Sequence, residues 1–179
     1  MKKPVALALT IVCAASVIVS AQRRIYTNPT PEEHVKRLFP EAAAFSPLEG
    51  TPLHFKAFGQ DPKANPGARP IGYVFWTTDL VPNEHGYHGP MHLLVAMDLA
   101  GIIKGVYLDY HGEPYGYFSV EPPKFVAQFT NKSIRDPFRV GQDIDAVSRA
   151  TISITSATRA VRDASRMMAR QFLDPAAVK

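Results

Sequence analysis

The chain has 179 residues, with 20 lysine and arginine residues, 16 aspartate and glutamate residues and a formal net charge of +4. Its apolar fraction of 46% and charged fraction of 20% are those of a globular protein and exclude a wholly disordered chain. The basic residues are scattered, with no basic stripe, so we expect no nucleic-acid binding. The single cysteine is Cys13, which excludes disulfides, iron–sulfur clusters and cysteine nucleophiles from the remainder of the chain.

The N-terminal segment has the pattern of a targeting sequence. Two lysines precede an apolar stretch, residues 4–21, which ends in the small residues Ser20 and Ala21. A signal peptide cleaved after Ala21 and a retained membrane anchor both stay open, because a spanning helix needs roughly 17–25 residues. A lipoprotein is the weaker alternative, since a large residue precedes the cysteine. Either way, we expect residues 22–179 to be extracytoplasmic (periplasmic), soluble after cleavage or tethered to the inner membrane by residues 4–21.

The first part of this domain is expected to hold one helix and much loop. A capping pattern at Thr30–Glu33 predicts a helix that runs to about Phe39 and stops before Pro40. Residues 46–70 contain five prolines and are expected to be mainly loop, with room for one short strand at 53–58.

The middle of the chain is expected to form a sheet. The β-branched and aromatic run Ile71–Thr77 predicts a strand. Met91–Asp98 and Ile102–Tyr110 are two apolar runs joined by a short link that contains Gly101, which predicts a β-hairpin. The segments before and after this hairpin, residues 80–90 and 111–120, are expected to be loops.

Two helices are expected to follow. Residues 121–129 predict a short helix with Phe125, Val126 and Phe129 on one face. A second helix is predicted over about 156–172, capped by Thr155 or Ser156 and ended by Asp174–Pro175. Its apolar residues recur at helical spacing: Ala157, Val161, Ala164, Met168 and Phe172. Central strands with helices at both ends predict an α+β fold, a single domain with a largely antiparallel sheet flanked by helices.

Small and hydroxyl residues lie just before the last predicted helix, in the segment 145–151. They let the chain turn tightly and bring Thr151 near a helix N-terminus, where free N–H groups favour a phosphate. Arg149 could add a positive contact to that phosphate. Asp145, Ser148 and Thr151 also suit ordinary turn and capping positions, so the residues alone leave both interpretations open.

This segment resembles the flavinylation motif of FMN-binding domains of the NosR, RnfG and NqrC type. Four positions match that motif: Asp145, Ser148, Ala150 and Thr151. Arg149 departs from it, standing where the motif usually has glycine. The resemblance implies that FMN is held covalently, its phosphate esterified to the Thr151 hydroxyl by a flavin transferase that uses FAD. Thr158 is a rival acceptor in a similar local pattern, but Ile152 stands where its motif would need aspartate.

Other segments extend the resemblance over roughly residues 34–165, closest to the peripheral domain of NosR. Residues 86–90 and 98–102 are similar to a glycine–tyrosine loop and the hairpin of that family. The loop at 111–116 is similar to one that contacts flavin, which implies FMN contacts from five residues: His111, Glu113, Pro114, Tyr115 and Gly116. Four aromatic residues are expected either to pack on the flavin ring or to enter the core: Tyr87, Tyr115, Tyr117 and Phe118.

The resemblance predicts an extracytoplasmic flavoprotein that transfers electrons between a membrane-bound oxidoreductase and a partner protein, rather than a stand-alone enzyme. The cysteine-rich part of NosR has no counterpart here, so we expect donor and acceptor on other chains. A non-redox regulatory or partner-binding module of the same fold is the main alternative. A metal-dependent hydrolase built on His85, His88 and His92 is a third, although loop histidines without a metal are favoured at these positions.

Overall fold

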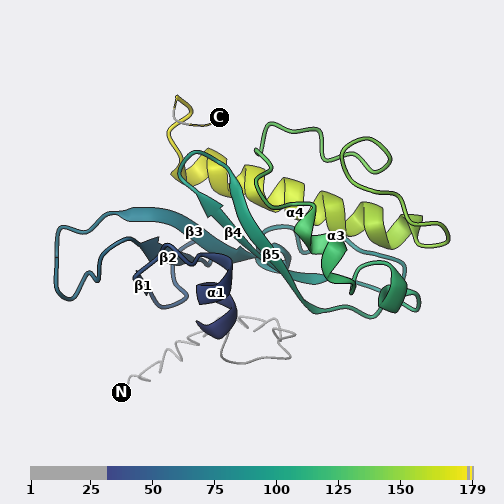
Figure 1. The fold of residues 1–179 in the computed structure, drawn as a ribbon, viewed down its shortest axis with the longest axis horizontal. Helices are drawn as coiled ribbons and strands as arrows, with labels where there is room; N and C mark the ends of the chain where they lie inside the picture. Colours follow the sequence, from purple (N-terminus) through teal and green to yellow (C-terminus); the bar gives the residue numbers. More distant parts are fainter. Residues whose placement is uncertain (1–31, 177, 179) are drawn as a thin grey trace, which may run out of the picture.

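In the described part of the chain, five strands form one sheet in which the order of the strands follows the order of the chain (Figure 1). The computed structural model describes residues 32–176 and residue 178. Every strand pairs antiparallel with its neighbour in the chain. The strands are β1 (Ala44–Phe45), β2 (Phe55–Phe58), β3 (Pro70–Trp76), β4 (His92–Asp98) and β5 (Ile103–Tyr110). The predicted α+β fold with an antiparallel sheet is confirmed.

The link between β4 and β5 shows why the predicted hairpin forms. Oδ1 of Asp98 accepts hydrogen bonds from the backbone N–H groups of Ala100 and Ile102, both at 2.9 Å. Gly101 has a φ of +76°, a left-handed conformation that glycine adopts without steric cost. The turn chemistry is therefore local and readable from the sequence.

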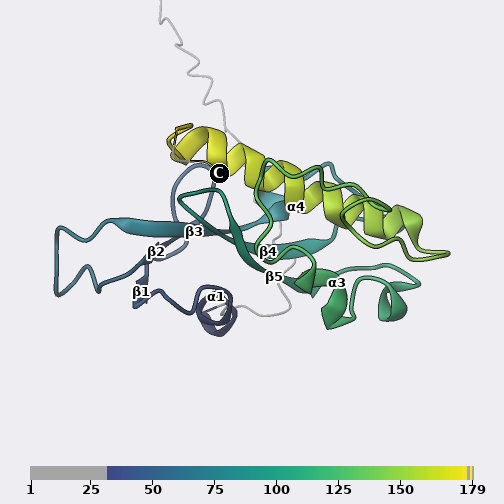
Figure 2. The same ribbon diagram turned by 45° about the horizontal axis from the view of Figure 1, so that its top comes forward.

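Helices cover both faces of the sheet. They are α1 (Glu32–Leu38), α2 (Thr77–Leu80), α3 (Pro123–Ala127) and α4 (Thr151–Phe172), with a 3₁₀ turn at Gly116–Phe118. Figure 2 shows α4 along one face of the sheet and α1 on the opposite face. The helix α3 packs beside β5, the strand at one edge.

Alternate residues of β3 and β4 enter two separate cores. Phe75 and Val95 are fully buried in the larger core, beneath α4. Trp76 and Leu94 are buried in the smaller core, with Val35 of α1. Because both faces are covered, these strands are nearly continuous apolar runs rather than alternating ones.

The helix α4 begins five residues earlier than the sequence predicts. Its N-cap is Ala150, so the expectation of a cap at Thr155 or Ser156 is wrong. Ile154 is fully buried, and its packing outweighs the weak helix propensity of the β-branched residues at this end. The spacing prediction itself is confirmed: Ala157, Val161, Ala164 and Met168 are fully buried, and Phe172 packs against them.

The shorter elements were predicted less completely. The strand at 53–58 and the helices at both ends are found, each with shifted boundaries, whereas β1 and α2 are too short to give a pattern.

The predicted targeting segment, Cys13 and the capping residue Thr30 lie outside the described residues. Within residues 32–176 and 178, no helix has the length and apolar character to cross a membrane.

Candidate functional site

Thr151 is the first residue of α4, the 22-residue helix, and its side chain is exposed. The N-cap Ala150 makes no side-chain hydrogen bond to the helix end. The N–H groups of the first turn have no carbonyl acceptor within the helix, and the helix dipole places partial positive charge there. The position therefore suits a phosphate group.

The residues before Thr151 form an exposed turn with one buried anchor. Ala150 is 4% exposed, donates its N–H to the Val147 carbonyl at 3.1 Å and accepts from the Ile154 N–H at 3.0 Å. Asp145, Ser148 and Arg149 are all exposed. The structure thus brings the motif residues together at the helix end, with their side chains accessible.

Arg149 occupies a backbone position that glycine would suit better. Its φ is +67°, in the left-handed region that residues with a Cβ atom rarely adopt. This conformation gives a physical reason for the glycine that the motif resembled by this segment usually has at this position. The tight turn into α4 needs the left-handed conformation, whichever side chain stands there.

Replacing Arg149 with glycine is expected to raise the free energy of unfolding by about 1 kcal/mol. Relief of the left-handed strain is worth about 1–2 kcal/mol, and the greater entropy of glycine in the unfolded chain offsets about 0.4–1 kcal/mol of it. Urea unfolding measures the change. Arg149→Ala removes the same side chain but keeps the strain, so it should give no gain; an equal gain in both variants would contradict this explanation.

Glu113 links three segments of the site. Its carboxylate is buried and accepts hydrogen bonds from the backbone N–H groups of Tyr87 and His88, each at 2.9 Å. The Ser153 hydroxyl, in the first turn of α4, donates a third. Burial acts to raise the pKa of Glu113, but these hydrogen bonds outweigh it and hold the pKa below its ordinary value. The carboxylate is therefore ionised, and it joins two loops to the helix end.

His111 is held inside its loop rather than left in solvent. Its side chain is 13% exposed, and its Nε2 lies 2.9 Å from Oε1 of Glu121. Its Nδ1 accepts the backbone N–H of Glu113 at 3.0 Å. Gly116, which is buried, lies directly against the His111 ring. His111 and Gly116 therefore shape the loop from within.

Three of the four singled-out aromatic side chains are exposed. The exposed fractions are 65% for Tyr87, 50% for Tyr115 and 68% for Tyr117. The core alternative is therefore wrong for these three, whereas Phe118 is partly buried against the larger core. Pro114 is also exposed. The loops tied by Glu113 thus carry flat apolar rings that a planar ligand can contact.

The three histidines of the metal hypothesis have separate environments. His92 is buried and stacks on Trp76 with ring centroids 4.0 Å apart, while its Nδ1 is 2.6 Å from Oγ1 of Thr78. His85 and His88 are exposed loop residues. Among the described residues, no group of three or more histidine, cysteine, aspartate or glutamate side chains is arranged to hold a metal ion.

The rival acceptor Thr158 has a different setting from Thr151. Its side chain is 1% exposed, and its hydroxyl donates to the Ile154 carbonyl at 2.7 Å. Ser153, which the sequence did not single out, is the residue that meets Glu113. Ser153 lies two positions after Thr151. The Ser153 side chain is buried, whereas the Thr151 side chain is exposed.

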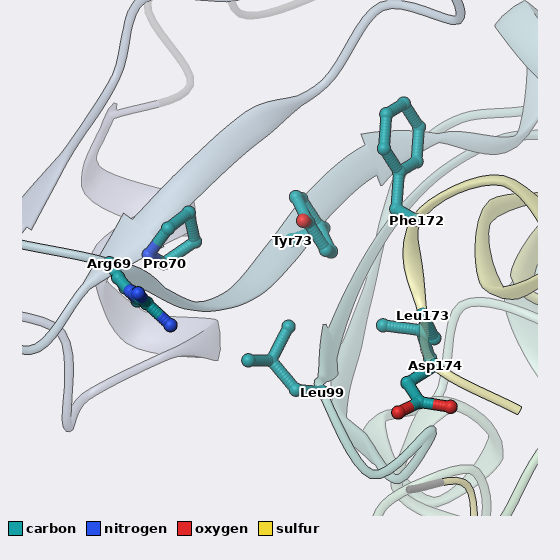
Figure 3. A pocket seen from close by; sticks show the side chains of 7 residues that line it. All are labelled: Arg69, Pro70, Tyr73, Leu99, Phe172, Leu173 and Asp174. Atoms are coloured by element: carbon teal, nitrogen blue, oxygen red, sulfur yellow. The ribbon is translucent and has the colours of Figure 1, made fainter. Parts of the chain in front are cut away.

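Two surface hollows lie at the C-terminal end of α4, and their linings do not include Thr151, Ser153 or Glu113. One, of about 320 Å³, has Tyr73 and Phe172 in its lining, with Arg69 on one side and Asp174 on the other (Figure 3). A neighbouring hollow of about 240 Å³ includes Arg170. A helix of 22 residues spans roughly 30 Å, so these hollows lie far from Thr151.

The family comparison matches the part of the chain that contains the site. Residues 86–166 match the model of the FMN-binding domain. This range begins at the loop whose backbone N–H groups donate hydrogen bonds to Glu113. It ends within α4, beyond Thr151 and Ser153. No curated protein was found to be significantly similar to the chain. Residues 86–166 are a domain of the FMN-binding domain family, which makes the protein a flavin-binding protein.

Proposed function

We propose that this protein carries FMN covalently on Thr151 and relays electrons between a membrane-bound oxidoreductase and a partner protein outside the cytoplasm. The observation that carries the proposal is the exposed Thr151 hydroxyl at the first position of α4, within the matched FMN-binding domain. An acceptor for an incoming phosphoryl group has to be accessible to the enzyme that delivers it. The helix end also offers the N–H groups and the partial positive charge that a phosphate ester needs.

The attachment step transfers an FMN group from FAD with no change in oxidation state. Oγ of Thr151 forms a bond to the phosphorus next to the riboflavin part of FAD. The bond between that phosphorus and the oxygen bridging the two phosphates breaks, and AMP leaves with this oxygen. The hydroxyl proton of Thr151 is released. The partner for maturation is a flavin transferase, since the chain itself presents only the acceptor.

The residues around Thr151 fit a bound FMN. The first-turn N–H groups and Arg149 would hold the phosphate, and Ser148 stands beside them on the exposed turn. Tyr87, Tyr115 and Tyr117 would contact the flat ring from the loops that Glu113 ties together. When bound, FMN supplies one- or two-electron chemistry at its isoalloxazine ring, and the protein positions that ring.

The choice of Thr151 over Thr158 is supported by their surroundings. The Thr158 hydroxyl is buried and already donates to a carbonyl of its own helix. Modifying it would require α4 to leave the sheet, because residues next to it in α4 belong to the larger core. Thr151 needs no such movement.

The proposed location rests on the targeting pattern of residues 4–21. A protein that works outside the cytoplasm cannot readily replace a cofactor that dissociates, which makes a covalent link useful there. The proposed redox partners are membrane-bound electron-transfer proteins on the donor side and another protein on the acceptor side.

Intact-mass measurement after co-expression with a flavin transferase tests the proposal. The wild-type protein should gain the mass of FMN less one water, and Thr151→Val should gain nothing because it has no hydroxyl. Thr151→Ser, which keeps the hydroxyl, should still be modified, and so should Thr158→Val. Absence of the gain in the wild-type protein would overturn covalent attachment and favour a non-redox module. A gain that persists in Thr151→Val but disappears in Thr158→Val would overturn the site.

A further inference from the structure

We propose that Glu113 is a positioning residue that fixes the first turn of α4 against the loop at residues 86–90, and so sets the orientation in which Thr151 is presented. The inference rests on the proposed attachment at Thr151 and deepens it. Glu113 does not touch the acceptor oxygen; it acts through Ser153.

The carboxylate of Glu113 divides its two oxygens between separate parts of the chain. Oε1 accepts the N–H of His88 at 2.9 Å. Oε2 accepts the N–H of Tyr87 at 2.9 Å and also the hydroxyl of Ser153. One side chain therefore joins a loop before β4 to a helix that begins after residue 150, by way of the loop after β5. Loss of this carboxylate would leave the buried Ser153 hydroxyl and two part-buried N–H groups without their acceptor.

The loop backbone lies directly on the carboxylate, which leaves it little freedom. A Cβ atom at Gly86 would lie 2.5 Å from Oε1 and 2.7 Å from Cδ of Glu113. At its other end, Glu113 donates its own N–H to His111, whose ring also meets Glu121. Both the backbone and the side chain of Glu113 are therefore held in place.

Helix geometry connects Ser153 to Thr151. Two residues along an α-helix correspond to a rotation of about 200°, so these two side chains point to nearly opposite sides. Ser153 is 4% exposed and faces Glu113, whereas Thr151 is exposed. Holding Ser153 in place therefore fixes the rotation of the first turn and the direction of the Thr151 hydroxyl.

An amide cannot replace the carboxylate, although its shape is the same. The three groups that meet Glu113 are all donors, namely two N–H groups and one hydroxyl. In Glu113→Gln, one end of the side chain becomes an NH₂ group, which cannot accept a hydrogen bond. At least one of these donors then faces another donor, and the link between the loop and α4 weakens.

Kinetics of FMN attachment, measured by intact mass with a purified flavin transferase and FAD, test this role. In Glu113→Gln and in Ser153→Ala, we expect the rate constant at saturating acceptor protein to fall roughly tenfold or more, because the acceptor is no longer held in one orientation. The KM for FAD should not change. The double variant should lose no more than Glu113→Gln alone, since both changes break one connection.

A matched control is Glu84→Gln. Glu84 lies on the segment just before Gly86 and pairs with Arg159 of α4 at 2.9 Å, nearly two turns beyond the Ser153 contact. It is another carboxylate that meets α4, but it does not reach the first turn, so its loss should leave the rate constant unchanged. Hydrogen exchange of the Tyr87 and His88 amides should accelerate in Glu113→Gln and stay as in the wild type in Glu84→Gln.

The outcomes separate this inference from the attachment itself. If the wild-type protein takes up no FMN, attachment at Thr151 is overturned and the role of Glu113 in presenting it falls with it. If the wild-type protein is modified and both Glu113→Gln and Ser153→Ala react at its rate, the positioning role alone is overturned. Should Glu113→Gln fail to fold, as judged by circular dichroism, Ser153→Ala decides the question, because it removes a single hydroxyl.

Discussion

Replacing Phe129 with alanine is expected to lower the free energy of unfolding by about 3–5 kcal/mol. Phe129 is fully buried, with its ring perpendicular to that of Phe125 at 5.4 Å and stacked near that of Phe138 at 6.3 Å. Its loss would leave a cavity between α3 and the segment that leads to Thr151, and close packing allows little collapse around it. Urea unfolding followed by circular dichroism measures the change.

Tyr117→Ala is the control for Phe129. It removes a similar ring from a side chain that is 68% exposed, so its effect should stay within about 0.5 kcal/mol. A loss below about 1 kcal/mol in Phe129→Ala would show that the cluster of three phenylalanines is not an essential part of the core.

Replacing Gly116 with alanine should destabilise the protein by about 1–3 kcal/mol and disturb the loop at 111–116. A Cβ atom at position 116 would lie on the ring of His111, well within van der Waals contact. The ring cannot move aside freely, since both of its nitrogens are engaged, by Glu113 and by Glu121. The expected result is a lower urea midpoint together with faster hydrogen exchange at the Glu113 amide.

Gly112→Ala tests the same loop without the clash. The nearest atoms to a Cβ at this position lie 3.8 Å away, in His88, which is an ordinary contact distance. This variant should unfold close to the wild type. Equal destabilisation by the two substitutions would mean that glycine is needed in this loop for backbone freedom rather than for space beside His111.

The fold was predictable where the signal is local. The β4–β5 hairpin follows from two apolar runs and the Asp98–Gly101 link, and α4 follows from the apolar spacing between Ala157 and Met168. The start of α4 was not predictable, because the residues from Thr151 to Thr155 include four β-branched side chains. They are helical because Ile154 packs into the core, a contact that local sequence does not encode.

The site was predictable in part, for the same reason. The motif around Thr151 is contiguous, so a resemblance could point to it. The contact between Glu113 and Ser153 spans 40 positions in the chain, and nothing local signals it. The resemblance implied contacts between Glu113 and FMN, but it did not indicate the hydrogen bonds that the Glu113 side chain makes to the protein. The conformation of Arg149 likewise became visible only with its φ of +67°.

The order of assembly follows from the sheet. Each strand pairs with the next one in the chain, so the whole sheet can form by hairpin closure as the chain lengthens. The helix α4 comes after all five strands, and only its docking brings Ser153 to Glu113. The acceptor hydroxyl would thus be correctly presented only in a chain that has finished folding. Under the proposed function, a flavin transferase that recognises this arrangement would leave incomplete chains unmodified, and the flavin would mark the mature protein.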